Sequence, residues 1–252
     1  MKAKLNIISI VSPFGGTGKT TLVFELGKAF VSINQRVLLV DLDPKSDLTS
    51  IAGIEPDPKY LSMAEVLLRE TTMHNTLANV GDFTVAISSS NLSAAEGRLK
   101  QVDGIIRLKE ALEEVSPMFD LVIVDCPPNL GRLTQNAIVA SDLTLTPVLE
   151  DLNIENSVIS VNEAVNSVRQ QFNTNLTKLK IVRVYDDKDH DDKNVQIINE
   201  ISEKYSDQVL KTTIAQLSRI REGYQQGQLE MNMVSTDEIV ELSKELLDEM
   251  RV

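Results

Sequence analysis

A glycine-rich segment near the amino terminus limits the folds that this chain can adopt. Residues 12–21 read Ser-Pro-Phe-Gly-Gly-Thr-Gly-Lys-Thr-Thr and lie between an apolar run at residues 5–11 and an amphipathic stretch. Glycines let the backbone wrap tightly with its N–H groups pointing inward, and the positive end of a following helix adds to this concavity for anions. The pattern therefore predicts a phosphate-binding loop between a strand and a helix.

Two side chains of this segment match the chemistry of a bound triphosphate. Lys19 can reach the β- and γ-phosphates, and the Thr20 hydroxyl can ligate Mg²⁺. The strict pattern G-x-x-x-x-G-K-[ST] would place glycine at position 13, where this chain has Pro13. A glycine-rich turn without a ligand is the alternative, but the flanking strand and helix favour the phosphate loop. The candidate nucleotide-binding residues are Phe14, Gly15, Gly16, Thr17, Gly18, Lys19, Thr20 and Thr21.

Short apolar runs alternate with amphipathic helical patterns along most of the chain. The runs are nearly continuous, which is typical of parallel strands that are covered on both faces. We therefore expect an α/β fold with a doubly wound, mostly parallel sheet and helices on both faces. We interpret residues 53–81 as an insertion of turns and short helices over one edge, within a single domain that spans residues 1–252. The predicted strands are 5–11, 36–41, 83–87, 121–124, 143–148, 179–184 and 209–214.

Two of these strands end in aspartates. The run at residues 36–40 leads into Asp41-Leu42-Asp43-Pro44, and the run at residues 121–124 leads into Asp125. In doubly wound sheets, ligands bind beyond the carboxyl ends of the strands. Asp125 is then placed to hold Mg²⁺ through water, and Asp43 to orient or activate an attacking water. The predicted metal-side residues are Thr20, Asp43 and Asp125.

Composition excludes several other classes of protein. The chain of 252 residues has a formal net charge of −12 and one cysteine, Cys126. A negative field repels phosphate, so the chain as a whole is not a basic nucleic-acid binder. One cysteine excludes an intrachain disulfide and an all-cysteine metal site. No apolar stretch approaches the roughly 18 residues of a membrane span, and residues 5–11 read as a strand, not a secretory leader. We expect a cytoplasmic protein with Cys126 in a packing role.

Three motifs together resemble those of the ParA/MinD family of deviant Walker-type ATPases, which position plasmids, chromosomes and other cargo in bacteria. They are Gly-Gly-Thr-Gly-Lys-Thr-Thr at residues 15–21, Val-Asp-Leu-Asp-Pro at 40–44, and the segment 119–131; residues 140–148 and 213–219 also fit. The resemblance implies an ATP-sandwich homodimer with Mg²⁺, slow hydrolysis, and stimulation by a ParB-like or McdB-like adaptor. It also implies that Asp43 is the hydrolytic carboxylate, that Asp125 is the metal-side one, and that Ala215 and Gln216 contact the nucleotide.

The chain departs from the family at one position. Members usually have lysine directly before the Gly-Gly pair, where it reaches the partner's nucleotide across the dimer, and this chain has Phe14 there. Phenylalanine cannot neutralise phosphate charge, so the contact is lost or comes from another cation. The carboxysome-positioning McdA branch also lacks this lysine, so its absence does not imply inactivity. The candidate substitutes are Lys188, Lys193, Lys45 and Arg132.

Charged segments in the second half of the chain bear on partners. On the resemblance, cations of the carboxyl-terminal third bind nonspecific nucleoid DNA; scattered surface cations are the alternative. The acidic loop at residues 186–192 lacks the ligand spacing of a calcium or transition-metal site and reads as a solvated loop. The last helix, at residues 236–250, has an acidic polar face, which argues against membrane targeting. The candidate DNA-binding residues are Lys204, Lys211, Arg219 and Arg221.

These observations favour an ATP-driven positioning or partitioning switch. A metabolic ligase similar to dethiobiotin synthetase is the first alternative, although no motif for a second substrate is present. A scaffold that dimerises without turnover is the other alternative; Phe14 argues for it, and the intact Asp43 and Asp125 argue against it.

Overall fold

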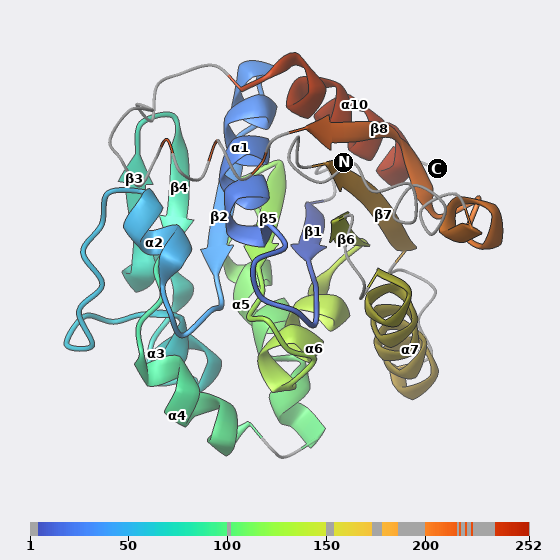
Figure 1. Ribbon diagram of the computed structural model, residues 1–252. Helices are drawn as coiled ribbons and strands as arrows, with labels where there is room; N and C mark the ends of the chain where they lie inside the picture. Colours follow the sequence, from blue (N-terminus) through green and yellow to red (C-terminus); the bar gives the residue numbers. More distant parts are fainter. Residues whose placement is uncertain are drawn as a thin grey trace.

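An eight-stranded sheet forms the centre of the protein, as the computed structural model shows (Figure 1). The structure describes residues 5–99, 102–149, 154–172, 178–185, 200–215, 217, 220, 223 and 235–251. The strand order is β3-β4-β2-β5-β1-β6-β7-β8, and only β3 runs antiparallel to its neighbour. The strands are β1 (Asn6–Ile10), β2 (Val37–Asp41), β3 (Leu77–Val80), β4 (Phe83–Ala86), β5 (Leu121–Asp125), β6 (Leu143–Leu149), β7 (Lys178–Tyr185) and β8 (Val209–Ala215).

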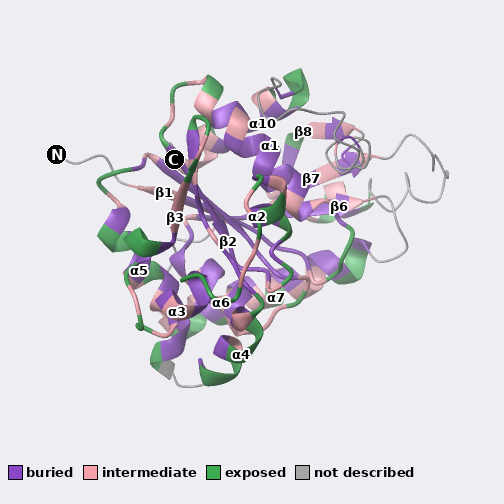
Figure 2. Cartoon of the chain, turned by 90° about the vertical axis from the view of Figure 1, so that its left-hand side faces the viewer, coloured by how far each residue is buried: buried purple, intermediate pink, exposed green. Residues whose placement is uncertain are grey.

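Helices cover both faces of this sheet, as the apolar runs predict. The helices are α1 (Lys19–Ser32), α2 (Asp47–Ile51), α3 (Met63–Leu67), α4 (Asn91–Arg98), α5 (Arg107–Val115), α6 (Arg132–Ala140), α7 (Ile154–Phe172) and α10 (Asp237–Arg251), with 3₁₀ turns η1 (Met73–Thr76) and η2 (Val102–Ile105). Neighbouring strand residues point to opposite layers: Ile7 packs with α5 and α6, whereas Ile8 packs with α1 and α10. In Figure 2 the buried residues run through the sheet, and the exposed ones lie on outer helices and loops.

The predicted strands agree with the observed ones, with one omission. Residues 53–81 contain α3 and η1, as expected of an insertion, but they end in the strand β3, which the sequence analysis missed. β3 is short and only half-buried, so it carries no continuous apolar run. It pairs with β4 alone, across a tight turn in which Gly81 has a φ of 56°. A hairpin with an edge strand of this kind depends on its neighbour more than on its own sequence.

The helix α10 packs on the rest of the chain through its apolar face. Ile239, Leu242 and Leu246 are fully buried against α1 and β8. Among the described residues, no helix combines the length and the apolar character that a membrane crossing requires.

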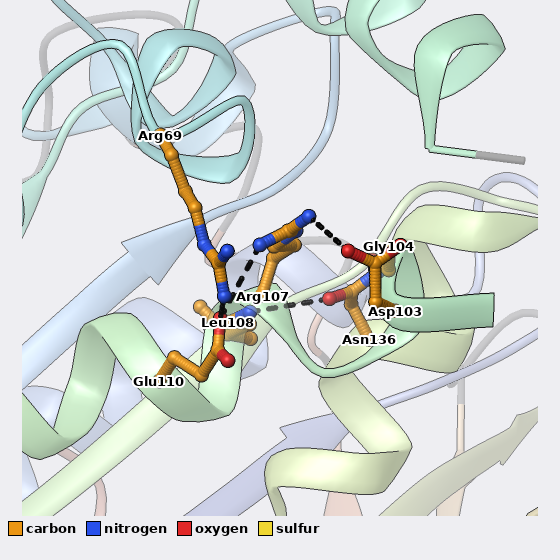
Figure 3. Close-up of polar contacts among 7 residues, drawn as sticks. All are labelled: Arg69, Asp103, Gly104, Arg107, Leu108, Glu110 and Asn136. Carbon is orange, nitrogen blue, oxygen red and sulfur yellow. Dashed lines mark hydrogen bonds and ion pairs between the residues drawn. The ribbon is translucent and has the colours of Figure 1, made fainter. Parts of the chain in front are cut away.

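A cluster of charged side chains joins the helices α3, α5 and α6, which cover the face of the sheet opposite to α1 and α10 (Figure 3). Arg107, at the start of α5, pairs with Asp103 at 2.6 Å and lies beside Glu110, which Arg69 reaches from the end of α3. Asn136 of α6 accepts a hydrogen bond from the Leu108 N–H at 3.1 Å. These contacts therefore stabilise the packing of the helices and do not involve the carboxyl ends of the strands.

The order of the strands brings the predicted motifs to one place. The strands β4, β2, β5 and β1 are neighbours in the sheet and run parallel. The loops that follow them therefore meet at one edge, which is where doubly wound sheets bind ligands.

Candidate functional site

The loop after β1 forms the floor of this edge. Gly16 and Gly18 have φ values of 81° and 79°, in the left-handed region that favours glycine. Gly18 is also the N-cap of α1, and no side chain caps the first turn of that helix. The N–H groups in the first turn of α1 are therefore available to donate hydrogen bonds to a ligand, and this positive end of the helix favours an anion.

Lys19 closes the loop. Its side chain is buried, and its Nζ donates a hydrogen bond to the Phe14 carbonyl oxygen at 3.0 Å. Burial lowers the pKa of Lys19, while the carboxylate of Asp125 acts in the opposite direction. The ammonium is therefore held across the glycine-rich turn, where it can meet phosphate oxygens.

Asp125, at the end of β5, is the least satisfied polar group of the site. Both of its carboxylate oxygens are buried, and among the described residues neither has a hydrogen-bond partner. Burial, followed by the neighbouring Asp41, raises the pKa of Asp125 well above its usual value, while Thr20 and Lys19 favour its charged form. Buried carboxylates without partners are costly, and a bound cation would compensate this one.

The residues present fit Mg²⁺ held together with phosphates. Among the described residues, no group of three or more histidine, cysteine, aspartate or glutamate side chains could hold a metal by itself. Mg²⁺ is usually bound by one or two carboxylates together with substrate phosphates, so a complete protein cage is not required. Asp125 supplies the unpartnered oxygens, and Thr20 lies in the first turn of α1.

Asp41, which was not among the residues predicted from the sequence, also belongs to this cluster. It lies directly beside Asp125 in the register of β2 and β5. It is fully buried, and burial raises its pKa to about 7. Its carboxylate accepts hydrogen bonds from Thr49, through the N–H at 2.9 Å and the hydroxyl at 2.7 Å, and from the Asp43 N–H at 3.1 Å. Its place at the carboxyl end of a buried strand is the signal that could have identified it.

Asp43 follows in the loop after β2. It is 7% exposed, and its Oδ1 accepts a hydrogen bond from the Lys45 N–H at 2.9 Å. Its main-chain oxygen accepts from the Ser46 N–H at 2.9 Å and from the Ser88 hydroxyl at 2.7 Å. The carboxylate and the backbone of Asp43 are thus both held in place near the loop that contains Lys19.

Two other loops border the phosphate loop. A Cβ atom added at Gly18 would lie 3.1 Å from Leu217, so the Leu217 side chain packs on the loop. A Cβ added at Gly15 would lie 3.9 Å from Pro128, in the segment after β5. Cys126 is fully buried in the apolar core, as predicted.

The predicted cations lie in different environments. Lys45 is exposed beside Asp43, and Arg132 begins α6 and donates a hydrogen bond to Gln135 at 3.2 Å. Lys204 pairs with Glu155, in the first turn of α7, at 3.3 Å, and Lys211 lies in β8. Phe14 is 37% exposed at the edge. The remaining candidates, Lys188, Lys193, Gln216, Arg219 and Arg221, lie outside the described residues, as does the acidic loop at 186–192.

The sheet, the glycine-rich loop and the carboxylates at the strand ends define a P-loop nucleotide-binding fold. The sequence family described as an AAA domain matches residues 5–178. The sporulation initiation inhibitor protein Soj of Bacillus subtilis is 33% identical over 224 residues, which cover 88% of each chain. The chain belongs to the ParA/MinD family of P-loop ATPases.

Solved structures agree with this assignment. A McdA variant from Cyanothece in complex with ATP is 25% identical, with a TM-score of 0.84 over 97% of this chain and 96% of that one. Cobyrinic acid a,c-diamide synthase from Mycobacterium smegmatis, with bound ADP and magnesium, is 27% identical, with a TM-score of 0.84 over 98% of this chain and 96% of that one. The fold therefore occurs both in the partition and positioning ATPases and in a protein whose name is that of a biosynthetic enzyme.

Proposed function

We propose that this chain is an ATP-dependent, dimerising ATPase that positions or partitions cargo inside the cell. ATP closes a homodimer that binds nucleoid DNA, and an adaptor protein, ParB-like or McdB-like, stimulates hydrolysis and releases the dimer. The cargo is a plasmid, a chromosome or a protein organelle, and the protein acts in the cytoplasm on the nucleoid. The observation that carries the proposal is the buried carboxylate of Asp125, which makes no short hydrogen bond among the described residues and lies near the Thr20 hydroxyl and the Lys19 ammonium.

Binding of the triphosphate rests on the phosphate loop. The backbone N–H groups around Gly16 and Gly18 and the ammonium of Lys19 bind phosphate oxygens. Ala215, at the end of β8, and Gln216, which follows it in the sequence, contact the nucleotide. Thr20, Asp43 and Asp125 hold Mg²⁺, which supplies charge neutralisation for the phosphates when it is bound.

Hydrolysis depends on Asp43. Phosphoryl transfer needs little covalent help from a protein, and catalysis comes mostly from positioning and charge. Asp43 orients or activates the attacking water, and Lys19 stabilises the charge that develops on the phosphate oxygens. Hydrolysis is slow without the adaptor if one of the contacts to the water or to the phosphate forms only when the adaptor binds.

The contact across the dimer needs a cation other than residue 14. Lys45 is exposed beside Asp43, and Arg132 begins the helix after the Asp125 loop, so both lie at the carboxyl edge. Lys188 and Lys193 are the other candidates. A single alanine substitution at the residue that makes this contact should abolish ATP-dependent dimerisation and leave monomer binding of ATP intact.

The first test is solution mass by light scattering, without nucleotide, with ADP and Mg²⁺, and with ATP and Mg²⁺, using Asp43→Ala to block hydrolysis. A dimer with ATP alone supports the switch. The variants Lys188→Ala, Lys193→Ala, Lys45→Ala and Arg132→Ala then locate the contact across the dimer. A monomer in every state, or a dimer that ignores the nucleotide, contradicts the proposal.

DNA binding is tested separately with a nonspecific duplex. It should require ATP, and it should weaken steeply as salt rises because phosphate contacts release counterions. Charge reversal at Lys211, Arg219 or Arg221 should weaken it strongly. The change at Lys204 should be smaller because its ammonium already pairs with Glu155. Binding that is independent of ATP and of these residues contradicts this part of the proposal.

The likeness to cobyrinic acid a,c-diamide synthase favours a metabolic ligase as the second candidate. Such an enzyme would transfer the γ-phosphate to a small acid instead of to water. The two functions separate in one assay, since a ligase releases phosphate only when its second substrate is present. Phosphate release with ATP and Mg²⁺ alone, stimulated by an adaptor, supports the switch.

A further inference from the structure

Three consecutive serines follow β4 and differ in their environments. Ser88 and Ser89 are each 1% exposed, whereas Ser90 is exposed and its side chain makes no capping hydrogen bond at the start of α4. Burying a hydroxyl group is costly unless it is hydrogen-bonded, so the first two serines need partners and the third does not.

Ser88 joins the loop after β4 to the loop that contains Asp43. Its hydroxyl donates a hydrogen bond to the main-chain oxygen of Asp43 at 2.7 Å, and its N–H donates to the Thr49 hydroxyl at 3.0 Å. The Thr49 hydroxyl in turn donates to Asp41 at 2.7 Å. Ser88 thus contacts Asp43 in the loop after β2 and Thr49 in the helix α2 that follows this loop. Both contacts are possible because β4 is the parallel neighbour of β2.

Ser89 continues the chain of hydroxyl groups into the insertion. Its hydroxyl lies 2.9 Å from that of Ser62, which is the N-cap of α3 and forms a capping box with Glu65. Asn91 donates a hydrogen bond to the same glutamate at 3.1 Å. The segment that carries Ser88 is therefore anchored on its far side to α3, and it cannot shift without breaking buried hydrogen bonds.

We propose that Ser88 is a positioning residue for Asp43, and that Ser89 holds Ser88 in place through Ser62. The inference rests on the proposed function and extends it. The Asp43 oxygen that Ser88 contacts belongs to the main chain, so the loss of this hydroxyl shifts the backbone and moves the carboxylate with it. The phosphate loop follows a different strand, β1, and Thr20 and Asp125 remain in place for Mg²⁺, so KM for ATP should change less than kcat. A shift of about 1 Å in a catalytic group is enough to slow a reaction by roughly 100-fold.

The test compares Ser88→Ala, Ser89→Ala and the matched control Ser90→Ala in the full chain. The measurements are kcat and KM for ATP hydrolysis with Mg²⁺, together with the melting temperature. We expect kcat to fall about 10-fold in Ser88→Ala and about 3-fold in Ser89→Ala, with KM within about 2-fold and no change in Ser90→Ala. Thr49→Val, which removes the hydroxyl that accepts the Ser88 N–H, should act in the same direction as Ser88→Ala.

Hydrogen–deuterium exchange supplies a measurement that does not need turnover. In Ser88→Ala the amides of Lys45 and Ser46, which donate to Asp43, should exchange faster, and in Ser90→Ala they should not. If the unmodified protein hydrolyses no ATP, the proposed function fails and the exchange result alone decides the role of Ser88. The inference is overturned if exchange and kcat in Ser88→Ala equal those of Ser90→Ala. It is also overturned if kcat and KM worsen together in proportion to a loss of melting temperature.

Discussion

Carboxylates gather in two parts of this molecule, and their surroundings are opposite. At the ends of β2 and β5, Asp41 and Asp125 are buried side by side, and Asp125 has no hydrogen-bond partner among the described residues. Along α10, the Glu245 carboxylate accepts hydrogen bonds from the N–H groups of Lys211 and Thr212, at 2.8 and 3.0 Å, and Glu238 accepts from the Ala215 N–H at 3.1 Å. Asp41 and the glutamates of α10 are thus hydrogen-bonded within the protein, whereas Asp125 is left for a cation.

The pKa directions express the same contrast. Burial raises the pKa of Asp125 well above its usual value. Burial also acts to raise the pKa of Glu245, but the hydrogen bonds from Thr212 and Lys211 outweigh it and lower the pKa. The reason lies in the sheet. β8 is its last described strand, so its outward N–H groups need acceptors, which α10 supplies. β5 is an inner strand whose main chain is paired on both sides, so no backbone N–H of a neighbouring strand is left to donate to the Asp125 carboxylate.

The largest expected effect comes from the lysine at the first of these sites. Lys19→Ala should weaken ATP binding by about 1000-fold, or about 4 kcal/mol, because a buried cation that meets phosphate is lost. Lys180→Ala is the matched control, since Lys180 of β7 pairs with Glu249 of α10 at 2.8 Å, away from the phosphate loop. It should leave ATP affinity unchanged in a titration followed by calorimetry. Equal losses in both variants would contradict the assignment of the site.

The pH dependence of stability should differ between the two regions. The pKa of Asp41 is higher in the folded chain, at about 7, than the usual value of 3.8 for an aspartate. The folded state therefore holds this proton more tightly, and the resulting stability is present below pH 4 and lost as pH rises to about 7. In protein free of metal and nucleotide, the free energy of unfolding should fall by about 4 kcal/mol over this interval. Asp41→Asn should remove this fall. Urea denaturation at a series of pH values measures the free energy of unfolding. The same pH profile in Asp41→Asn and the unmodified protein would show that folding does not raise the pKa of Asp41.

Glu245 should show the opposite sign. Its pKa is lower in the folded chain, so its contribution is present above its unfolded pKa and is lost as pH falls through the folded pKa.

Removal of the charge at Asp125 should separate stability from function. At pH 8 and without Mg²⁺ or nucleotide, Asp125→Asn should raise the melting temperature by roughly 2–8 °C, because it removes an uncompensated buried carboxylate. The same variant should lose most of the Mg²⁺-dependent part of ATP binding. Glu245→Gln is the comparison, and it should lower the melting temperature slightly. A drop of melting temperature in Asp125→Asn would show that this carboxylate is already satisfied in the free protein.

The smallest expected effect concerns the glutamates of α10. Glu245→Ala should reduce the free energy of unfolding by about 1 kcal/mol, because the Lys211 and Thr212 N–H groups lose their acceptor. Glu241→Ala is the control on the same helix, where the side chain is exposed, and it should be neutral. Denaturant titrations of both variants would resolve the difference, and equal values would rule out a specific role for Glu245.

The sequence predicted the fold class and most of the candidate site. The alternation of apolar runs and helical stripes indicated the covered parallel sheet, and the phosphate loop and the aspartates at the strand ends were identified from short segments. The strand β3 was missed because it is half-buried and depends on pairing with β4. The roles of Asp41 and Ser88 were missed because their contacts join residues that are not close in the chain.

What the sequence by itself determined is therefore local: a glycine-rich turn, a lysine and a threonine behind it, and carboxylates at the ends of two buried strands. Only the tertiary structure decided which carboxylate would be left without a partner and which serine would contact Asp43, 45 residues away. The physical reason is that neighbours in a parallel sheet are joined by crossovers through helices, so the side chains that meet at its edge leave no periodic pattern in the sequence.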